Sequence, residues 1–406
     1  MQMPPVLKSN NQKAFIFLLF VAGIAYWPVS LGILSLKNDA LIYFLPWRYH
    51  ISESIQNGHF PFWSPYLFTG LPIYSDMPAG TWNPIVLLVS LVTRYNMRIL
   101  EWELFSYIVI GGFGLYKLIT ETGNSYRSSI VCGVAYMCCG FITDSGSFIS
   151  WINCAAWLPY VFVFFYRTLK SPSVLSAIKW GLSLFLLFTT CDPTFLFFST
   201  YIMLAALICW LIQYRRDSKN LFLILKYFAV GSVIFFILSA PALISYIDFF
   251  PYYTRGGGAT LGQSLTDPFP PFSSISYLLP NTVVKPHPWL ETDIAMRNAY
   301  TGIFTLVFFI TALSRKLSPF YKFILGTTLF SFLFSLGEYT PVRQLSYHFL
   351  PLLNTFRHPA IVRVFTTLGI IIVAAPVMSS YLAGTVDHRK KIRAVCGALI
   401  AVISLV

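Results

Sequence analysis

The chain has 406 residues, of which 56% are hydrophobic and only 11% are charged. A soluble domain carries about 25% charged residues, so this composition excludes a soluble globule and indicates an integral membrane protein. The formal net charge of +13 comes mainly from basic residues between apolar segments, which indicates membrane topology rather than nucleic-acid binding.

Apolar runs bounded by charged residues recur along the chain, and a run of about 20 residues can cross a bilayer as a helix. The first, from Ala14 to Leu36, is too long and evenly apolar for a signal-peptide core, so we expect a retained helix. Further spans are expected near residues 99–119, 128–143, 151–166, 174–191, 194–213, 222–247, 299–314, 319–336 and 361–383. Another apolar run follows Arg393 and stops at Val406, which predicts an incomplete C-terminal span.

The expected fold class is therefore an all-α polytopic membrane protein with about 10–11 transmembrane helices. We expect a single transmembrane domain over residues 1–406.

Basic residues alternate between the connections, because cytoplasmic loops retain Lys and Arg. With the N-terminus inside, the inner segments hold most of the 28 Lys and Arg residues and only the acids Glu121, Asp217 and Asp387. The long connections 37–98, 248–298 and 337–360 then face outward. Any chemistry is expected on that extracytoplasmic face.

The first outer connection, residues 37–98, contains two apolar pieces too short to span. From Ala40 to Asn57, apolar residues recur at intervals of three and four while Arg48 falls on another face. This spacing predicts an amphipathic helix in the membrane interface, with Gly58 at its C-terminal cap. The segment Ile85 to Val92 is expected to form a second interfacial or re-entrant piece.

Between these pieces lies a segment rich in proline and aromatic residues. Prolines at 61, 65, 72, 78 and 84 forbid a long helix. Its large aromatic residues, which prefer the headgroup level, include Trp63, Tyr66, Phe68, Tyr74 and Trp82. We expect this loop to lie on the membrane surface, either roofing a cavity for a half-lipidic substrate or serving only as an interfacial anchor.

The same loop carries a family resemblance. Asp39, Pro46 and Arg48, followed by NGHFPFWSPYLFTGLPIYSDMPAGTWNPIVLL, resemble the first extracytoplasmic loop of YfhO-like bacterial membrane proteins. In that family an Asp just after the first helix precedes a G-x-x-P-x-W-x-P-Y-x-x-x-G-x-P pattern, which here runs from Gly58 to Pro72. Further similar segments are SISYLLPN (274–281), YTGIFTLVFFITAL (300–313), FSLGEYTPVRQL (334–345) and LPLLNTFRHPAIVRVF (350–365).

The chain also departs from the family pattern in places. The return into the membrane reads Trp82, Asn83, Pro84 instead of a Y-P-x-N-x-L-like sequence. After the fifth span the chain reads CDPT (191–194), where a more polar motif with glycine and glutamine is expected. Family members commonly continue well beyond 406 residues.

The resemblance implies a GT-C type glycosyltransferase in the bacterial cytoplasmic membrane. It implies transfer of a sugar from a polyprenyl-phosphate donor to a cell-envelope glycopolymer or glycolipid on the extracytoplasmic face. Inversion at the sugar carbon is likewise implied by the resemblance alone.

Such a transfer needs a base for the acceptor hydroxyl. A carboxylate at the membrane boundary is partly desolvated and accepts a proton more readily, which favours Asp39, where the resemblance also puts the loop acid. The alternative is an ordinary boundary acid paired with Arg48. Asp192 is either a second functional acid or the start of a helix. Asp76 and Asp144 are further candidates.

Two other acids, Glu101 and Glu103, lie at a span's outer end and are expected to form a solvated rim.

The departing lipid phosphate needs a cation. We favour Arg357, with Arg363 second and His358 assisting, because a guanidinium matches phosphate oxygens bidentately. The alternative is that these arginines reach lipid headgroups. Further loop residues expected to contact substrate are Arg48, Trp63, Tyr66, His287 and Arg297.

The histidines show no HxxxH or HExxH spacing, so the sequence supports no dedicated metal site. A divalent cation held by carboxylates and the lipid phosphate is compatible with the chemistry. The rival interpretations are a transporter or lipid flippase, which charges buried in mid-span would favour, and a noncatalytic assembly subunit.

Overall fold

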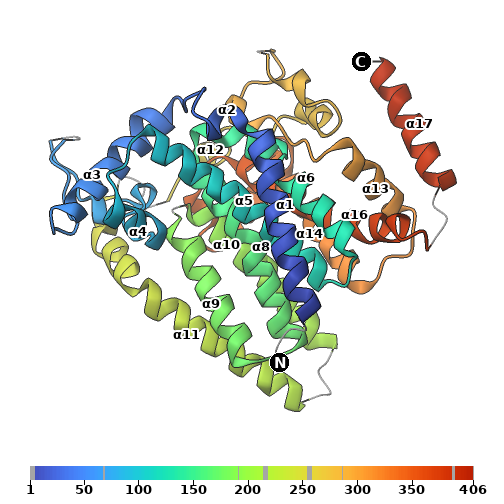
Figure 1. Ribbon diagram of the computed structural model, residues 1–406, viewed down its shortest axis with the longest axis horizontal. Coiled ribbons are helices and arrows are strands. Elements are labelled where there is room, and N and C mark those ends of the chain that lie inside the picture. The colour runs from blue at the N-terminus through green and yellow to red at the C-terminus, as the bar shows by residue number, and fades with distance from the viewer. Residues whose placement is uncertain are drawn as a thin grey trace. The chain divides into compact units, whose positions relative to one another are not determined.

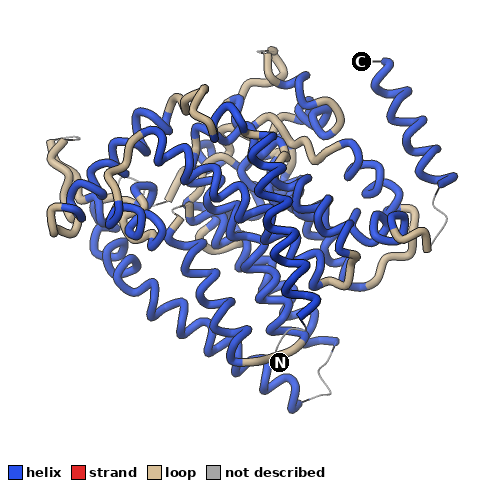
Figure 2. The backbone as a smooth tube through the Cα atoms, in the orientation of Figure 1, coloured by secondary structure: helices blue, strands red, loops and turns tan. Residues whose placement is uncertain are grey.

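The computed structural model describes residues 5–66, 69–190, 192–213, 218–253, 258–285, 287–385 and 389–405. Within these ranges the chain is helical and has no strand, only an isolated bridge between Ser64 and Leu71 (Figures 1 and 2). The predicted all-α class is confirmed. Residues named above that lie outside these ranges are Phe68, Cys191, Asp217, Asp387 and Val406.

Six segments of the described chain are long and apolar enough to cross a membrane. They are formed by α5 (Met97–Glu121), α6 with α7 (Tyr126–Met137 and Gly140–Asp144), α8 (Ile149–Lys170), α10 (Pro193–Gln213), α11 (Ser218–Phe249) and α16 (Arg363–Leu382). Helices at the other expected positions are shorter or less apolar: α1 (Pro5–Ala25), α9 (Val174–Thr189), α13 (Ile303–Leu313), α14 (Pro319–Ser335) and α17 (Arg389–Leu405). These segments indicate a multi-pass protein in a lipid bilayer, with fewer full-length spans than the sequence predicts.

The first span is shorter than predicted. Helix α1 ends at Ala25 rather than at Leu36, and a single turn, α2 (Trp27–Ser30), follows. Pro28 lacks an N–H and cannot bond to the carbonyl four residues earlier, which favours a helix break just before it and a new helical start at α2. The amides of Ile33 and Leu34 instead bond to the Pro28 carbonyl oxygen, at 2.8 and 2.9 Å.

The chain divides into two compact units. The described residues of the ranges 1–25, 111–145 and 258–406 form one, here called the α16 unit. Its centre is α16, which is buried from Arg363 to Val373 and packs against α6, α13 and α14. Because α16 contacts its neighbours on several sides, its sequence is apolar all round instead of amphipathic.

The second unit comprises the ranges 26–110 and 146–257 and is called the α8 unit. In it, α9 packs against α8 on one side and α11 on another, and α9 and α11 run side by side in Figure 1. The contact is close because Gly181 and Gly231 face each other: a Cβ at position 181 would lie 2.4 Å from the Gly231 carbonyl oxygen. Small residues at such a crossing let two membrane helices approach closely.

We predict that Gly181→Val lowers stability by about 1–3 kcal/mol, because the side chain would force the α9 and α11 backbones apart. The measurement is the apparent melting temperature of the purified chain in detergent. Gly326→Val in α14 is the matched control, since a Cβ at that position meets nothing within 4 Å. Equal shifts for the two variants would contradict the prediction.

Candidate functional site

The connection 37–98 contains the helix that its spacing predicts. A π-helical turn, η1 (Ala40–Phe44), leads into α3 (Leu45–Gln56), and Asn57 caps it. Gly58 follows with φ of 78°, a left-handed conformation that glycine adopts without strain. The second predicted piece is also helical, as α4 (Pro84–Val92), with the Asn83 side chain accepting from the Ile85 amide. α3 and α4 pack against each other.

The position of Arg48 differs from the prediction. Instead of lying on a polar face of α3, Arg48 is buried, with 2% of its surface exposed, and it is bound to Glu103 of α5. Its Nε donates to Glu103 Oε2 and its Nη2 to Oε1, both at 3.2 Å. Asn153 of α8 donates to the same Oε1 at 3.0 Å. The expected alternative pairing of Arg48 with Asp39 is therefore wrong.

The prediction that Glu101 and Glu103 form a solvated rim is also wrong, because both carboxylates are buried and paired with arginines. Glu103 is buried in the pair with Arg48, and Glu101 is 2% exposed. Glu101 accepts from Arg98 at 3.2 Å. A buried carboxylate is retained only when charges and hydrogen bonds compensate its lost hydration, and these arginines supply that compensation.

Arg48 also reaches the segment that contains Asp76. Its Nη1 donates to the carbonyl oxygen of Ala79, at the end of the 3₁₀ turn η3 (Met77–Ala79). Gly80 follows with φ of 70°, and a Cβ there would lie 2.5 Å from Arg48 Nη1. The sequence at position 80 therefore has to be glycine for both backbone and contact reasons.

Two loop carboxylates have no bonded partner within the described part of the chain. Asp39 precedes η1, is half-buried and makes no cap hydrogen bond. Asp76 lies between η2 (Ile73–Ser75) and η3, and burial raises the pKa of its carboxyl group from 3.8 to about 7. η2 packs against α11.

Two of the aromatic loop residues are exposed, whereas Tyr74 and Trp82 are half-buried. Trp63 is 56% exposed and Tyr66 76%. Trp63 lies against Gly70, because a Cβ there would come within 2.3 Å of the indole ring. His50 anchors the loop to α3 through its Nε2, 3.0 Å from the Trp63 carbonyl oxygen. These side chains give the loop an outward aromatic surface.

Asp192 begins a helix. Its Oδ1 accepts from the Thr194 amide at 3.0 Å at the start of α10. Burial raises the pKa of this carboxyl group, and the Thr194 bonds oppose the rise. The helix-start alternative thus describes the observed geometry.

In the α16 unit, Asp144 lies at the end of α7. Its Oδ1 accepts from Thr143 Oγ1 at 2.9 Å and from Asn298 Nδ2 at 3.2 Å. The predicted span 128–143 is broken just before it, where the Gly140 amide bonds to the Tyr300 carbonyl oxygen at 2.8 Å. Asn298 can approach α7 closely because Gly140 has no side chain: a Cβ at that position would lie 2.1 Å from Asn298 Oδ1.

Arg363 is part of the same cluster and is fully buried, so the alternative that it reaches lipid headgroups is wrong. Its guanidinium donates to the carbonyl oxygens of Asn298 at 3.0 Å, Ala360 at 2.9 Å and Ala295. It also lies over the Phe141 ring, with 4.8 Å to the centroid. This commitment to backbone carbonyls gives Arg363 a structural role.

Arg357 and His358 lie in the half-buried segment before α16. His358 has φ of 59°, and its Nδ1 is 2.8 Å from Asp267 Oδ2, whose residue has φ of 53°. Next to them, Gly337 lies between Pro268 and Pro359, where a Cβ would approach within 2.7 Å.

Arg343 of α15 (Pro341–Phe349) is a buried residue that no sequence pattern singled out. It donates to the carbonyl oxygens of Ser264, Leu353 and Phe356, at 3.1, 3.0 and 2.8 Å. Burial lowers the pKa of its guanidinium to about 10. The only sequence signal is an arginine within a short helix between proline-rich loops, which does not distinguish it from exposed arginines.

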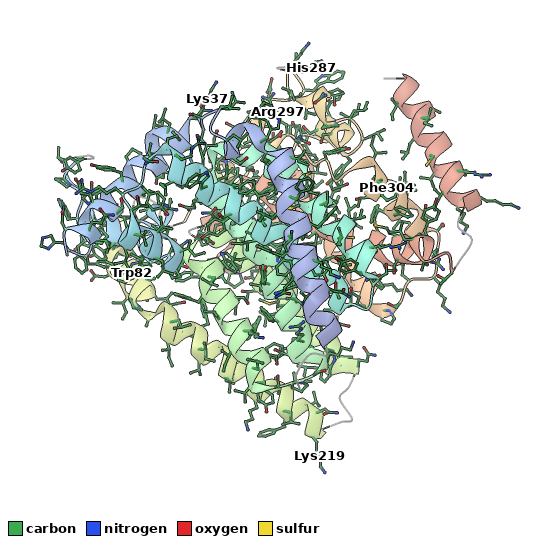
Figure 3. The ribbon with its side chains drawn as sticks, in the orientation of Figure 1. Lys37, Trp82, Lys219, His287, Arg297 and Phe304 are labelled. Carbon is green, nitrogen blue, oxygen red and sulfur yellow. The ribbon has the colours of Figure 1, made fainter. Side chains whose placement is uncertain are left out.

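The remaining loop candidates are shown in Figure 3. His287 points outward and stacks on Phe272, with ring centroids 5.4 Å apart. Arg297 is half-buried and its Nε donates to the Thr292 carbonyl oxygen at 2.9 Å. His287 is thus more accessible to a ligand than Arg297.

The candidate residues therefore fall into two groups. The α8 unit holds Asp39, Arg48, Trp63, Tyr66, Asp76 and Asp192, and the α16 unit holds Asp144, His287, Arg297, Arg357, His358 and Arg363. Across the described residues, no group of three or more His, Cys, Asp or Glu side chains is placed to hold a metal ion. Comparison with protein-family models and with curated proteins finds no match.

Asp76 yields a pH-dependent prediction. Because its folded-state pKa lies above 3.8, its contribution to stability declines as pH rises through the range up to about 7. The stability gained by Asp76→Asn should therefore grow between about pH 4 and pH 7 and then level off, at no more than about 4 kcal/mol. The measurement is the difference in apparent melting temperature between variant and wild type across this range. A difference independent of pH would contradict it.

Arg363 yields a second prediction. Arg363→Met removes the guanidinium donor of three buried carbonyl oxygens. The Ala360 oxygen keeps the backbone amide of residue 363, whereas those of Asn298 and Ala295 lose their side-chain donor, and we expect a loss of about 2–6 kcal/mol. Arg357→Met, at a half-buried position, is the matched control and should cost much less. The measurement is the fraction of monodisperse protein after extraction, together with its melting temperature. A fully stable Arg363→Met protein would refute the structural role.

Proposed function

We propose that the protein is a GT-C type membrane glycosyltransferase. In this proposal it transfers a sugar from a polyprenyl-phosphate donor to a cell-envelope acceptor on the outer face of the bacterial cytoplasmic membrane, with its N-terminus in the cytoplasm. One observation carries the proposal: the first loop is anchored by a buried ion pair and carries exposed aromatic side chains, and its Asp39 and Asp76 carboxylates have no bonded partner among the described residues.

The reaction is a direct displacement. The acceptor hydroxyl oxygen forms a bond to the anomeric carbon, the bond from that carbon to the phosphate oxygen breaks, and the phosphate leaves with the electron pair. A loop carboxylate takes the hydroxyl proton. The resemblance implies Asp39 for this role, whereas Asp76 has a pKa of about 7, which suits a general base at neutral pH.

The donor has an apolar chain and a charged headgroup. Trp63 and Tyr66 supply exposed, rigid contact area of the kind that prefers the membrane interface.

A transporter or flippase is the second candidate, favoured by charges buried within apolar spans. Glu103 of α5 and Arg363 of α16 are such charges. Both lie within about two turns of a helix end, and both bind loop residues or backbone. They therefore suit the anchoring of loops better than a transport path through the middle of the membrane.

The test compares cells carrying wild type, Asp39→Asn or Asp76→Asn at equal membrane levels. We expect loss of one envelope sugar and at least about a tenfold accumulation of its polyprenyl-phosphate carrier for the variant that lacks the base. Asp248→Asn, an exposed carboxylate of the same unit, is the control and should leave both unchanged. An unchanged profile in both loop variants would favour the transporter.

A further inference from the structure

We infer that the buried Arg48–Glu103 pair positions Asp76 as the group that accepts the proton of the acceptor hydroxyl. Arg48 is then a positioning residue and not a substrate contact. This inference rests on the proposed function and deepens it, because it selects one of the two loop carboxylates.

A short chain of hydrogen bonds connects the pair to Asp76. Glu103 accepts two bonds from Arg48, and Arg48 donates to the Ala79 carbonyl oxygen. The amide of Ala79 in turn donates to the Asp76 carbonyl oxygen at 3.1 Å. One residue thus separates the guanidinium from the backbone of Asp76, so a displacement of Arg48 changes the turn that carries the carboxylate.

The pair is itself held from three helices. Arg48 comes from α3, Glu103 from α5, and Asn153 of α8 fixes the shared oxygen Oε1. A planar guanidinium can bind a carboxylate with two parallel bonds and still donate to a third acceptor. A lysine ammonium at this position cannot reproduce that geometry.

Two further hydrogen bonds link the residues that follow Asp76 to those that precede it. Thr81 Oγ1 donates to the Ile73 carbonyl oxygen at 3.0 Å, and Trp82 Nε1 donates to that of Tyr74 at 2.7 Å. The segment that contains Asp76 is therefore fixed at both ends, yet its carboxylate has no bonded partner in the described part of the chain. A desolvated acid held rigidly without an internal donor is available to a proton from an external group.

Two glycines give a matched pair of variants. Gly80→Ala places a methyl group 2.5 Å from Arg48 Nη1, whereas Gly58→Ala meets nothing within 4 Å. Both positions have positive φ, 70° and 78°, so both variants carry a similar backbone strain. Only Gly80→Ala should displace the guanidinium from Ala79.

The readout is the protonation of Asp76, measured without reference to activity. A hydrophobic carbodiimide reacts with protonated carboxyl groups, and mass spectrometry of the purified full chain quantifies the labelled Asp76 peptide at each pH. With a pKa of about 7, wild type should label half-maximally near pH 7. Gly80→Ala and Arg48→Lys should admit water and lower this midpoint by about one pH unit or more. Gly58→Ala and Arg98→Lys should leave it within about 0.3 units.

A wild-type midpoint below about pH 5, or equal midpoints in wild type, Gly80→Ala and Arg48→Lys, overturns the inference. If the variants shift the midpoint but wild type transfers no sugar, the positioning role stands and the proposed function fails. If transfer occurs, the lower limb of its pH profile should move with the midpoint in Gly80→Ala. Sugar transfer that Asp76→Asn retains in full would show that Asp76 is not the base.

Discussion

The irregular parts of this protein depend on arginine side chains buried against backbone carbonyls. Arg48, Arg343 and Arg363 are among its largest fully buried side chains, and each donates to at least one carbonyl oxygen of a short turn or a loop. Such segments have acceptors that no helix satisfies, and burial of an unpaired acceptor is costly. One guanidinium provides five donors in a fixed plane, so a single arginine can donate to carbonyl oxygens of several loop segments at once.

Three of the cations thus hold loops and turns in place. Arg343 and Arg363 each contact three carbonyls, and both lie over an aromatic ring, Phe334 and Phe141. Arg48 differs because it also forms an ion pair with a carboxylate. The loop that we propose as the active one is therefore held by an ion pair as well as by hydrogen bonds. Its geometry depends on the charge of Arg48 or of Glu103.

The sequence predicted the helical parts well because their signal is local. The periodicity over residues 40–57, the glycine at 58 and the short apolar run before Thr93 all correspond to observed elements. The prediction failed for Arg48, Glu101 and Glu103, since a charged residue near a helix end was interpreted as solvent-facing. The partner of Arg48 is 55 residues away, and periodicity contains no information about contacts over that distance. Arg343 could not be found for the same reason.

The interleaving of the two units has a consequence for biosynthesis. The α8 unit is complete once residue 257 has been made, whereas the α16 unit draws on segments from both ends of the chain. Since synthesis proceeds from the N-terminus, α1 and α6 enter the bilayer long before α16, the helix that α6 packs against. Until then, the side of α6 that α16 will cover must be shielded by lipid or by insertion factors. The α16 unit can therefore pack only after residues 258–406 have been synthesised.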